Sequence, residues 1–316
     1  MSLETISLLI SPEAKSAYFK DYLEVCQQEL HSVMPGIETV YRNIGSLEFF
    51  DLDCDKSQLQ ALTRLSFVQG IFSRQGELLL PLPFSGDFVL HNDFVFGSKY
   101  RGKTNERLTQ MLINVGLGHI DEKNLDKVKL LDPMCGRATT LLWAMRYGIK
   151  AKGIEQDEKA LDDIRQSLKK WTKIHRQKHK INEGYTGKAN KKSLGKFLEF
   201  IAENTYMKVI IGDARNSHDV LKGERFDLIV SDLPYGVQHF TTDNTRNPLA
   251  VLKECMPQWQ ASLKPGGAIV LAFNSYIPKR IEMIKAFEEA GFKAQDFSAP
   301  HRMSESIVRD IVVFKA

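Results

Sequence analysis

Four acidic residues in the second half of the chain each follow a short hydrophobic run, and their order indicates one shared binding site. They are Asp132, Glu155, Asp213 and Asp232. Strands alternate with helices over this part of the sequence, which predicts a parallel sheet covered on both faces. Because the carboxyl ends of parallel strands meet at one edge of a sheet, we expect the four carboxylates at that edge.

The first acid opens a turn of small residues. A predicted strand over residues 128–131 runs into Asp132 and then into a short loop before an apolar helix. Such a loop lets the backbone approach a ligand, and the helix aims its first N–H groups at the ligand's polar end. The glycines of a dinucleotide motif are incomplete, and Asp132 would repel phosphates. The segment suits instead a cationic sulfonium with an α-amino group, bound by Asp132, Met134, Cys135 and Gly136.

Two further acids complete the predicted cofactor site. Glu155 ends the next strand about 20 residues beyond the turn, the spacing expected of an acid that accepts hydrogen bonds from both ribose hydroxyls. Asp213, followed by Ala214, ends a third strand and suits the amino group of adenine. One such acid alone can be a helix cap, but three on successive strands predict S-adenosylmethionine as the cofactor.

The fourth acid begins the most specific pattern in the chain, Asp232-Leu233-Pro234-Tyr235 at the end of a hydrophobic strand. An exocyclic base amine is a poor nucleophile because its lone pair is delocalised into the ring. The Asp232 carboxylate and the Leu233 carbonyl can each accept one N–H and hold the nitrogen in line with the sulfonium. Pro234 fixes the turn, and Tyr235 offers a ring for base stacking. We therefore predict methyl transfer to a base amine, with Asp232 available to take the proton; a plain strand-ending turn is the alternative.

The elements that position these residues fall into two predicted domains. Residues 1–95 show the order β-α-β-β-α-β, which predicts a small ferredoxin-like α+β domain, with an irregular α+β unit as the alternative. Its expected helices cover residues 12–33 and 56–65, and its expected strands cover residues 5–10, 37–43, 47–52, 67–73 and 77–82. Residues 96–316 predict an α/β domain with a Rossmann-like sheet. Its expected strands cover residues 128–131, 151–155, 208–211, 228–231, 268–273, 293–297 and 307–314.

A basic stretch interrupts the alternation of strands and helices. Residues 169–196 contain ten Lys/Arg residues and a single acid, Glu183. We interpret residues 169–205 as an insertion. Such a stretch is either a solvated helix face or a contact to phosphates, which Trp171 and Tyr185 would assist.

Composition limits the other functions. The formal charge of +4 is mild, and the four cysteines are scattered without a C-x-x-C pair, which predicts neither a metal site nor a disulfide framework. No apolar run approaches the roughly 20 residues that span a bilayer, and the N-terminus lacks the basic flank of a signal peptide. These features predict a cytoplasmic protein that binds neither metal nor membrane, and they leave the oligomeric state open.

Residues 132–139 (DPMCGRAT) and 232–236 (DLPYG) resemble motifs of the amino-methyltransferase branch of class I methyltransferases. More narrowly, they are similar to the D-P-M-C-G-S-G-T and D-P/L-P-Y/F-G motifs of the RNA methylase family that includes the tRNA guanosine-N2 methyltransferases. Residues 263–267 (LKPGG) and 100–106 (YRGKTNE) are similar to other segments of this group. The resemblance covers residues 95–316, and it implies a class I methyltransferase fold, S-adenosylmethionine, and guanine N2 of tRNA or rRNA as the acceptor. Residues 1–90 are similar only to the ferredoxin-like N-terminal regions of THUMP-associated enzymes.

The sequence departs from that family at two positions of the turn. Ala138 stands in place of a glycine and adds a methyl where the backbone nears the cofactor, and Arg137 stands in place of a serine. Arg137 could point to solvent or contact a substrate phosphate.

Three other functions are the alternatives. A DNA adenine-N6 or cytosine-N4 methyltransferase has the same chemistry, but no target-recognition domain is evident. A binding module without catalysis would not need Asp232, Pro234 and Tyr235. A protein-glutamine methyltransferase usually has Asn in place of Asp232.

Overall fold

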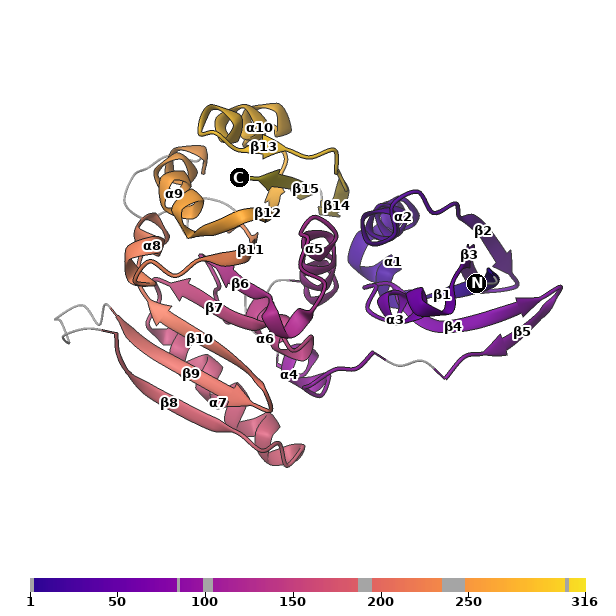
Figure 1. Ribbon diagram of the computed structural model, residues 1–316, viewed down its shortest axis with the longest axis horizontal. Coiled ribbons are helices and arrows are strands. Elements are labelled where there is room, and N and C mark those ends of the chain that lie inside the picture. Colours follow the sequence, from indigo (N-terminus) through magenta and orange to yellow (C-terminus); the bar gives the residue numbers. More distant parts are fainter. Residues whose placement is uncertain (1–2, 84–85, 99–104, 187–194, 235–247, 305–306) are drawn as a thin grey trace.

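The computed structural model describes residues 3–83, 86–98, 105–186, 195–234, 248–304 and 307–316. These residues form two units, each built around its own sheet, that lie side by side (Figure 1). None of the described helices is both long enough and apolar enough to cross a membrane.

The N-terminal unit has the predicted ferredoxin-like topology. Its strands lie in the order β2-β3-β1-β4-β5, and β1 pairs antiparallel with both β3 and β4. The fifth strand extends one edge beyond β4. The strands are β1 (Glu4–Ile10), β2 (Val40–Ile44), β3 (Leu47–Cys54), β4 (Val68–Gln75) and β5 (Leu78–Pro81).

The helices of this unit are shorter than predicted. The single helix expected over residues 12–33 is divided into α1 (Pro12–Tyr18), a 3-10 turn (Phe19–Asp21) and α2 (Tyr22–Val33). The break follows from Phe19, whose φ of 50° cannot continue a right-handed helix. The second helix reduces to a 3-10 turn (Lys56–Gln58) and α3 (Leu59–Leu62).

The second unit contains a ten-stranded sheet in the order β13-β15-β12-β11-β6-β7-β10-β9-β8, with β14 paired to β15. Strands β6, β7, β10, β11 and β12 are parallel neighbours, whereas β15 runs antiparallel to β12. The central strand β6 has β7 on one side and β11 on the other. The strand order therefore reverses beside β6, which is where open α/β sheets bind ligands.

Each of the seven strands predicted for this unit has a counterpart, although the one predicted over residues 293–297 is only the two-residue β13, and the helices alternate with the strands. The strands are β6 (Lys129–Asp132), β7 (Lys150–Glu155), β8 (Lys180–Tyr185), β9 (Lys196–Ala202), β10 (Thr205–Ile211), β11 (Phe226–Asp232), β12 (Leu263–Asn274), β13 (Lys293–Ala294), β14 (His301–Ser304) and β15 (Ile307–Lys315). The helices are α4 (Asp93–Phe96), α5 (Glu106–Gly118), α6 (Thr139–Arg146), α7 (Lys159–Ile174), α8 (Ser217–Val220), α9 (Leu249–Ser262) and α10 (Arg280–Glu289).

The basic stretch forms an extension of this sheet. Strands β8 and β9 pair as an antiparallel hairpin, and β9 pairs with β10 at the sheet edge (Figure 1). In the alternative that this stretch contacts phosphates, Trp171 was expected to assist, but Trp171 is buried and donates through Nε1 to Ser98 Oγ (2.9 Å). Tyr185 is exposed at the end of β8. Residues 187–194, which carry three of the lysines, lie outside the described residues.

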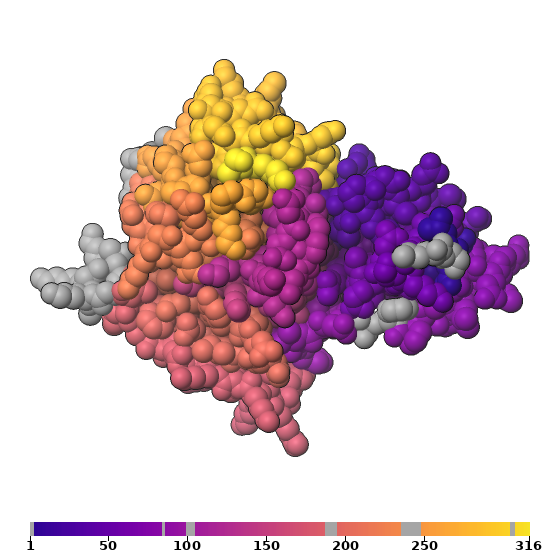
Figure 2. Space-filling view, in the orientation of Figure 1, coloured from indigo at the N-terminus to yellow at the C-terminus, as the bar shows by residue number. Residues whose placement is uncertain are grey.

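The two units meet along α2 and α5, and Figure 2 shows the N-terminal unit against the face of the second unit that α5 forms. A polar network closes this junction. Glu29 Oε1 accepts hydrogen bonds from Asn114 Nδ2 (2.6 Å) and Ser66 N–H (2.9 Å). The Arg64 carbonyl accepts from Asn114 (2.8 Å) and Tyr147 (2.9 Å). Because buried polar groups gain stability only when they are hydrogen-bonded, this network specifies one docking of the units.

Candidate active site

The four predicted acids lie at the carboxyl edge of the sheet. Asp132, Glu155 and Asp232 are the last residues of β6, β7 and β11. Asp213 follows β10 by two residues and accepts a hydrogen bond from Arg215 N–H (2.9 Å). Each acid therefore lies at the strand end where the sequence predicted it. The four carboxylates differ in their hydrogen-bond partners.

The turn after β6 is anchored to β7. Cys135 N–H donates to the Ile154 carbonyl (3.0 Å), and Gly136 N–H donates to Glu155 Oε2 (2.8 Å). Close approach requires Gly153, because a Cβ there would lie 2.6 Å from Cys135 Sγ. Gly136 has a φ of 52°, and within the described part of the chain no atom beyond its two chain neighbours would come within 4 Å of a Cβ at this position, so the turn leaves room beside its backbone.

Asp132 stabilises this turn through hydrogen bonds. Its carboxyl is buried, and Oδ1 accepts from Met134 N–H (3.1 Å) and from Ser231 Oγ (2.8 Å) on β11. Burial raises the pKa of Asp132 to about 7, and the charge of Asp232 adds to this rise, although hydrogen bonds from Thr140 and Ser231 oppose it. The carboxyl therefore joins β6, the turn and β11.

Glu155 binds the backbone through both oxygens. Oε1 accepts from Gln156 and Asp157 N–H (2.8 Å each), and Oε2 accepts from Gly136. A carboxylate offers about four lone-pair positions, so three backbone donors leave about one for a ligand. The half-buried side chain keeps that position accessible.

Asp213 is held by a neighbouring cation. Arg215 lies 2.7 Å from Asp213 and 3.1 Å from Glu254. Burial alone would raise the pKa of Asp213, but the hydrogen bonds and charge of Arg215 outweigh burial and hold that pKa below its ordinary value. Asp213 is therefore ionised at neutral pH, and Ala214 beside it is buried.

Asp232 forms a buried ion pair that the sequence analysis missed. Arg309 on β15 lies 3.3 Å from Asp232 Oδ2, and the side chains are 7% and 6% exposed. Ion pairing favours the charged form of a carboxylate. The available signal was the adjacent charged pair Arg309-Asp310 inside the mainly apolar strand β15, but nothing local linked Arg309 to a residue 77 positions earlier.

The residues after Asp232 are described in part. Leu233 is buried and donates its N–H to the Ala272 carbonyl (2.9 Å) on β12, which fixes the start of the turn. Pro234 is half-buried. Tyr235, predicted to stack on the base, lies outside the described residues, as does Gly236.

The two departures in the turn have separate structural consequences. Arg137 pairs with Asp157 (3.3 Å) and Asp163 (3.1 Å) near the start of α7, and its side chain stays 32% exposed. Ala138 adopts a φ of 66° and a ψ of 28° immediately before α6. This left-handed conformation costs an L-residue about 1–2 kcal/mol, and glycine would adopt it freely.

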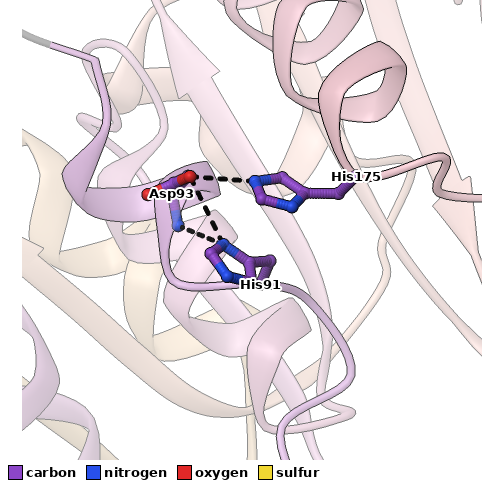
Figure 3. Close-up of side chains that lie close together, drawn as sticks. All are labelled: His91, Asp93 and His175. Carbon is purple, nitrogen blue, oxygen red and sulfur yellow. Dashed lines mark hydrogen bonds and ion pairs between the residues drawn. The ribbon is translucent and has the colours of Figure 1, made fainter.

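A second polar cluster lies away from this edge. His91, Asp93 and His175 come together where α4 meets the end of α7 (Figure 3), with His175 Nε2 2.9 Å from Asp93 Oδ2. The two imidazole rings are stacked, 3.7 Å apart with an interplanar angle of 22°. Ring nitrogens direct their lone pairs within the ring plane, and nearly parallel planes do not converge on one ion. This arrangement fits a hydrogen-bonded latch that holds α4 against α7.

Comparison with known proteins identifies one family. The UPF0020 family, described as an RMKL-like methyltransferase domain, matches residues 123–296, which is more than half of the chain. Ribosomal RNA small subunit methyltransferase B of Vibrio vulnificus is 35% identical over 96 residues. That match covers 27% of this chain and only 22% of the Vibrio protein, so the chain spans about a fifth of this relative.

Two of the similar solved structures come from Thermus thermophilus. TrmN is 13% identical, with 90% of this chain and 64% of that chain covered at a TM-score of 0.41. The 16S rRNA N2 G1207 methyltransferase RsmC, in complex with AdoMet and guanosine, is 16% identical, with 94% and 62% covered at a TM-score of 0.41. Neither TM-score is high enough to assign an activity.

Proposed function

The chain belongs to the UPF0020 family of RMKL-like methyltransferase domains, and on that premise we propose that it methylates an exocyclic base amine of RNA, with guanine N2 of tRNA or rRNA as the acceptor. The cofactor is S-adenosylmethionine, which supplies an electrophilic methyl group on a sulfonium. The observation that carries the proposal is Asp232, held at the carboxyl end of β11 beside Arg309 and followed by Leu233-Pro234.

The residues at the sheet edge fit a cationic cofactor with a ribose. Carboxylates gather at the strand ends, and the turn leaves space beside Gly136. We propose that Met134, Cys135 and Gly136 line the turn and that Asp132 holds it in place. Three backbone donors leave Glu155 with about one acceptor position, so it would bind one ribose hydroxyl rather than the two expected from the sequence.

The adenine side of the site would be formed beyond β10. Asp213 is kept ionised by Arg215, whose N–H, Nε and Nη2 groups already bind both carboxylate oxygens, so an adenine amino group would share an oxygen with Arg215. The buried Ala214 offers an apolar contact. Because Arg215 also binds Glu254 on α9, the Asp213 carboxylate is fixed before the cofactor binds. Such preorganisation lowers the entropic cost of binding.

Asp232 would act on the acceptor amine. Arg309 favours the ionised carboxylate, which can accept an N–H of the base and hold the nitrogen for in-line attack. As the nitrogen forms its bond to the methyl carbon it gains positive charge, and Asp232 is placed to take the released proton. The Leu233 carbonyl would accept the second N–H, and Tyr235 would stack on the base.

The N-terminal unit would aid RNA binding. Its sheet ends with β5, whereas the predicted bounds of residues 1–95 extend into α4, which packs against α6 and α7 of the second unit. It docks on the catalytic unit through the Glu29 network and α5, so it has a fixed place beside the methyltransferase domain. A folded RNA requires contacts beyond the methylated base, since sequence-specific recognition splays single bases out of loops and ends.

The proposal is tested by transfer of labelled methyl from S-adenosylmethionine to total RNA and, in parallel, to DNA. We expect label in RNA with wild type, none with Asp232→Ala, and wild-type transfer with Asp296→Ala, which removes an exposed carboxylate elsewhere. Digestion to nucleosides would then identify the base. Label in DNA alone would refute the RNA assignment, and full transfer by Asp232→Ala would refute the role of Asp232. Failure of wild type to bind the cofactor would indicate a binding module that has lost catalysis, with Ala138 as the cause.

A further inference from the structure

A cavity of about 270 Å³ lies at the junction of the two units, away from the carboxyl edge of the sheet. The N-terminal unit contributes mainly polar side chains to its wall, among them Ser11, Thr63 and Gln69. The catalytic unit contributes Arg107 and Arg146. A volume of this size admits a phosphate group together with part of the molecule that carries it.

Arg146 is a buried cation at this cavity. It is 2% exposed, and its NH groups donate to the Leu90 carbonyl and to Asn92 Oδ1, which are both neutral. Nε has no hydrogen-bond partner among the described residues. The rings of Phe88 and Trp143 face the guanidinium at 4.3 and 5.0 Å.

These contacts do not neutralise the charge. The pKa of Arg146 is lowered to about 10, mainly by burial and in part by the charge of Arg107; Tyr147 opposes this lowering, but no carboxylate among the described residues does. A buried charge without a counter-ion is costly, so the site favours an anion.

Arg107 adds a second cation to the cavity wall. It pairs with Glu13, which also lines the cavity, and it donates through Nη1 to Gln110 Oε1 (3.1 Å). Two arginines and one glutamate give the wall a formal charge of +1. The guanidinium groups and the hydroxyl and amide groups around them match the acceptor oxygens of a phosphate.

We propose that the cavity between the two units binds a phosphate group through Arg146 and Arg107. The phosphate belongs either to an RNA backbone that crosses both units or to a free phosphorylated molecule. This inference does not depend on the proposed methyl acceptor, because binding is measured without cofactor and without turnover.

The test changes the charge of the cavity without altering the buried arginine. Gln69 is exposed on β4 and lines the cavity, so Gln69→Glu and Gln69→Lys add opposite charges there. Gln75→Glu makes the same change at the far end of β4, outside the cavity wall, and serves as the matched control. Inorganic phosphate is titrated by thermal shift against chloride at equal ionic strength, and a short single-stranded RNA is titrated by fluorescence anisotropy.

We expect Gln69→Glu to weaken phosphate binding roughly fivefold and Gln69→Lys to strengthen it by a similar factor, as for a charge on the order of 8 Å from the anion. Gln75→Glu should bind like wild type. If RNA affinity shows the same ordering, the anion is a backbone phosphate; if only inorganic phosphate does, it is a free phosphate group. Equal affinities for all three variants, or no binding of phosphate and RNA by wild type, would overturn the proposal.

Discussion

The buried carboxyl of Glu29 makes folding stability depend on pH. Glu29 is fully buried on α2, and burial raises its pKa to about 7 although Ser66 and Asn114 donate hydrogen bonds to it. An unfolded chain holds a glutamate near its ordinary pKa of 4.5. Between these values the folded protein binds the proton more tightly than the unfolded chain does. The contribution of Glu29 to stability is therefore complete below about pH 4 and is lost as pH rises to about 7.

Replacement of Glu29 by glutamine should remove this dependence. The side chain keeps its shape: its carbonyl can accept from Ser66 N–H and Asn114, and its amide can donate to the Ser66 hydroxyl. A rise from 4.5 to about 7 is about 2.5 pKa units, which at 1.36 kcal/mol per unit gives about 3 kcal/mol. We expect Glu29→Gln to match wild type near about pH 4 and to exceed its free energy of unfolding by about 3 kcal/mol at about pH 8.

Urea unfolding followed by tryptophan fluorescence across this pH range measures the effect. Glu24→Gln changes an exposed glutamate on the same helix and should leave the pH dependence of wild type intact. Asp132, whose pKa is also raised to about 7, contributes a similar slope that persists in both variants. The reasoning is refuted if Glu29→Gln is less stable than wild type at about pH 8, or if its stability falls with pH as steeply as that of wild type.

Substitutions at the sheet edge test the candidate site itself. Arg309→Met should remove the ion partner of Asp232 and lower the free energy of unfolding by about 3 kcal/mol. Adding Asp232→Asn should recover part of this loss in a double-mutant cycle of urea melts, and simple additivity would contradict the pairing. Ala138→Gly should change stability by less than about 1 kcal/mol, because relief of left-handed strain and loss of a buried methyl oppose each other. Its cofactor affinity in a calorimetric titration should equal or exceed that of wild type, and a weaker affinity would show that the methyl is needed. Gly153→Ala should cost about 1–3 kcal/mol and weaken cofactor binding by pushing Cys135 outward, so an unchanged melting temperature and affinity would exclude the close approach.

Strand positions and topology were predictable because their signals are local. The hydrophobic runs before Asp132, Glu155 and Asp232 indicated where these strands end. The alternation of strands and helices predicted the parallel sheet. The hairpin of β8 and β9 was not predicted. Its lysines and glycine suit a solvated loop, and its strand structure depends on pairing with β10, which follows later in the chain.

The predicted length of the first helix was wrong because a contact distant in sequence ends it. The apolar spacing over residues 12–33 fits a continuous helix, and no glycine or proline marks the break at Phe19. The left-handed backbone there is held by the surroundings, since Tyr18 and the adjoining 3-10 turn pack against β14 of the other unit. A contact between residues about 280 positions apart leaves no trace in local sequence.

The difference between local signals and contacts distant in sequence also limits what can be predicted about a binding site. The order of strands and turns fixes where a carboxylate lies, but its partners are often supplied by other strands. Asp213 meets Arg215 two residues later, whereas Asp232 meets Arg309 across two strand pairings, from β11 to β12 and from β12 to β15. What a carboxylate can still bind depends on how many of its acceptor positions those partners occupy. Asp132 is turned inward and Glu155 keeps about one position, so Asp232 is the acid whose chemistry depends most on a partner the motif does not contain.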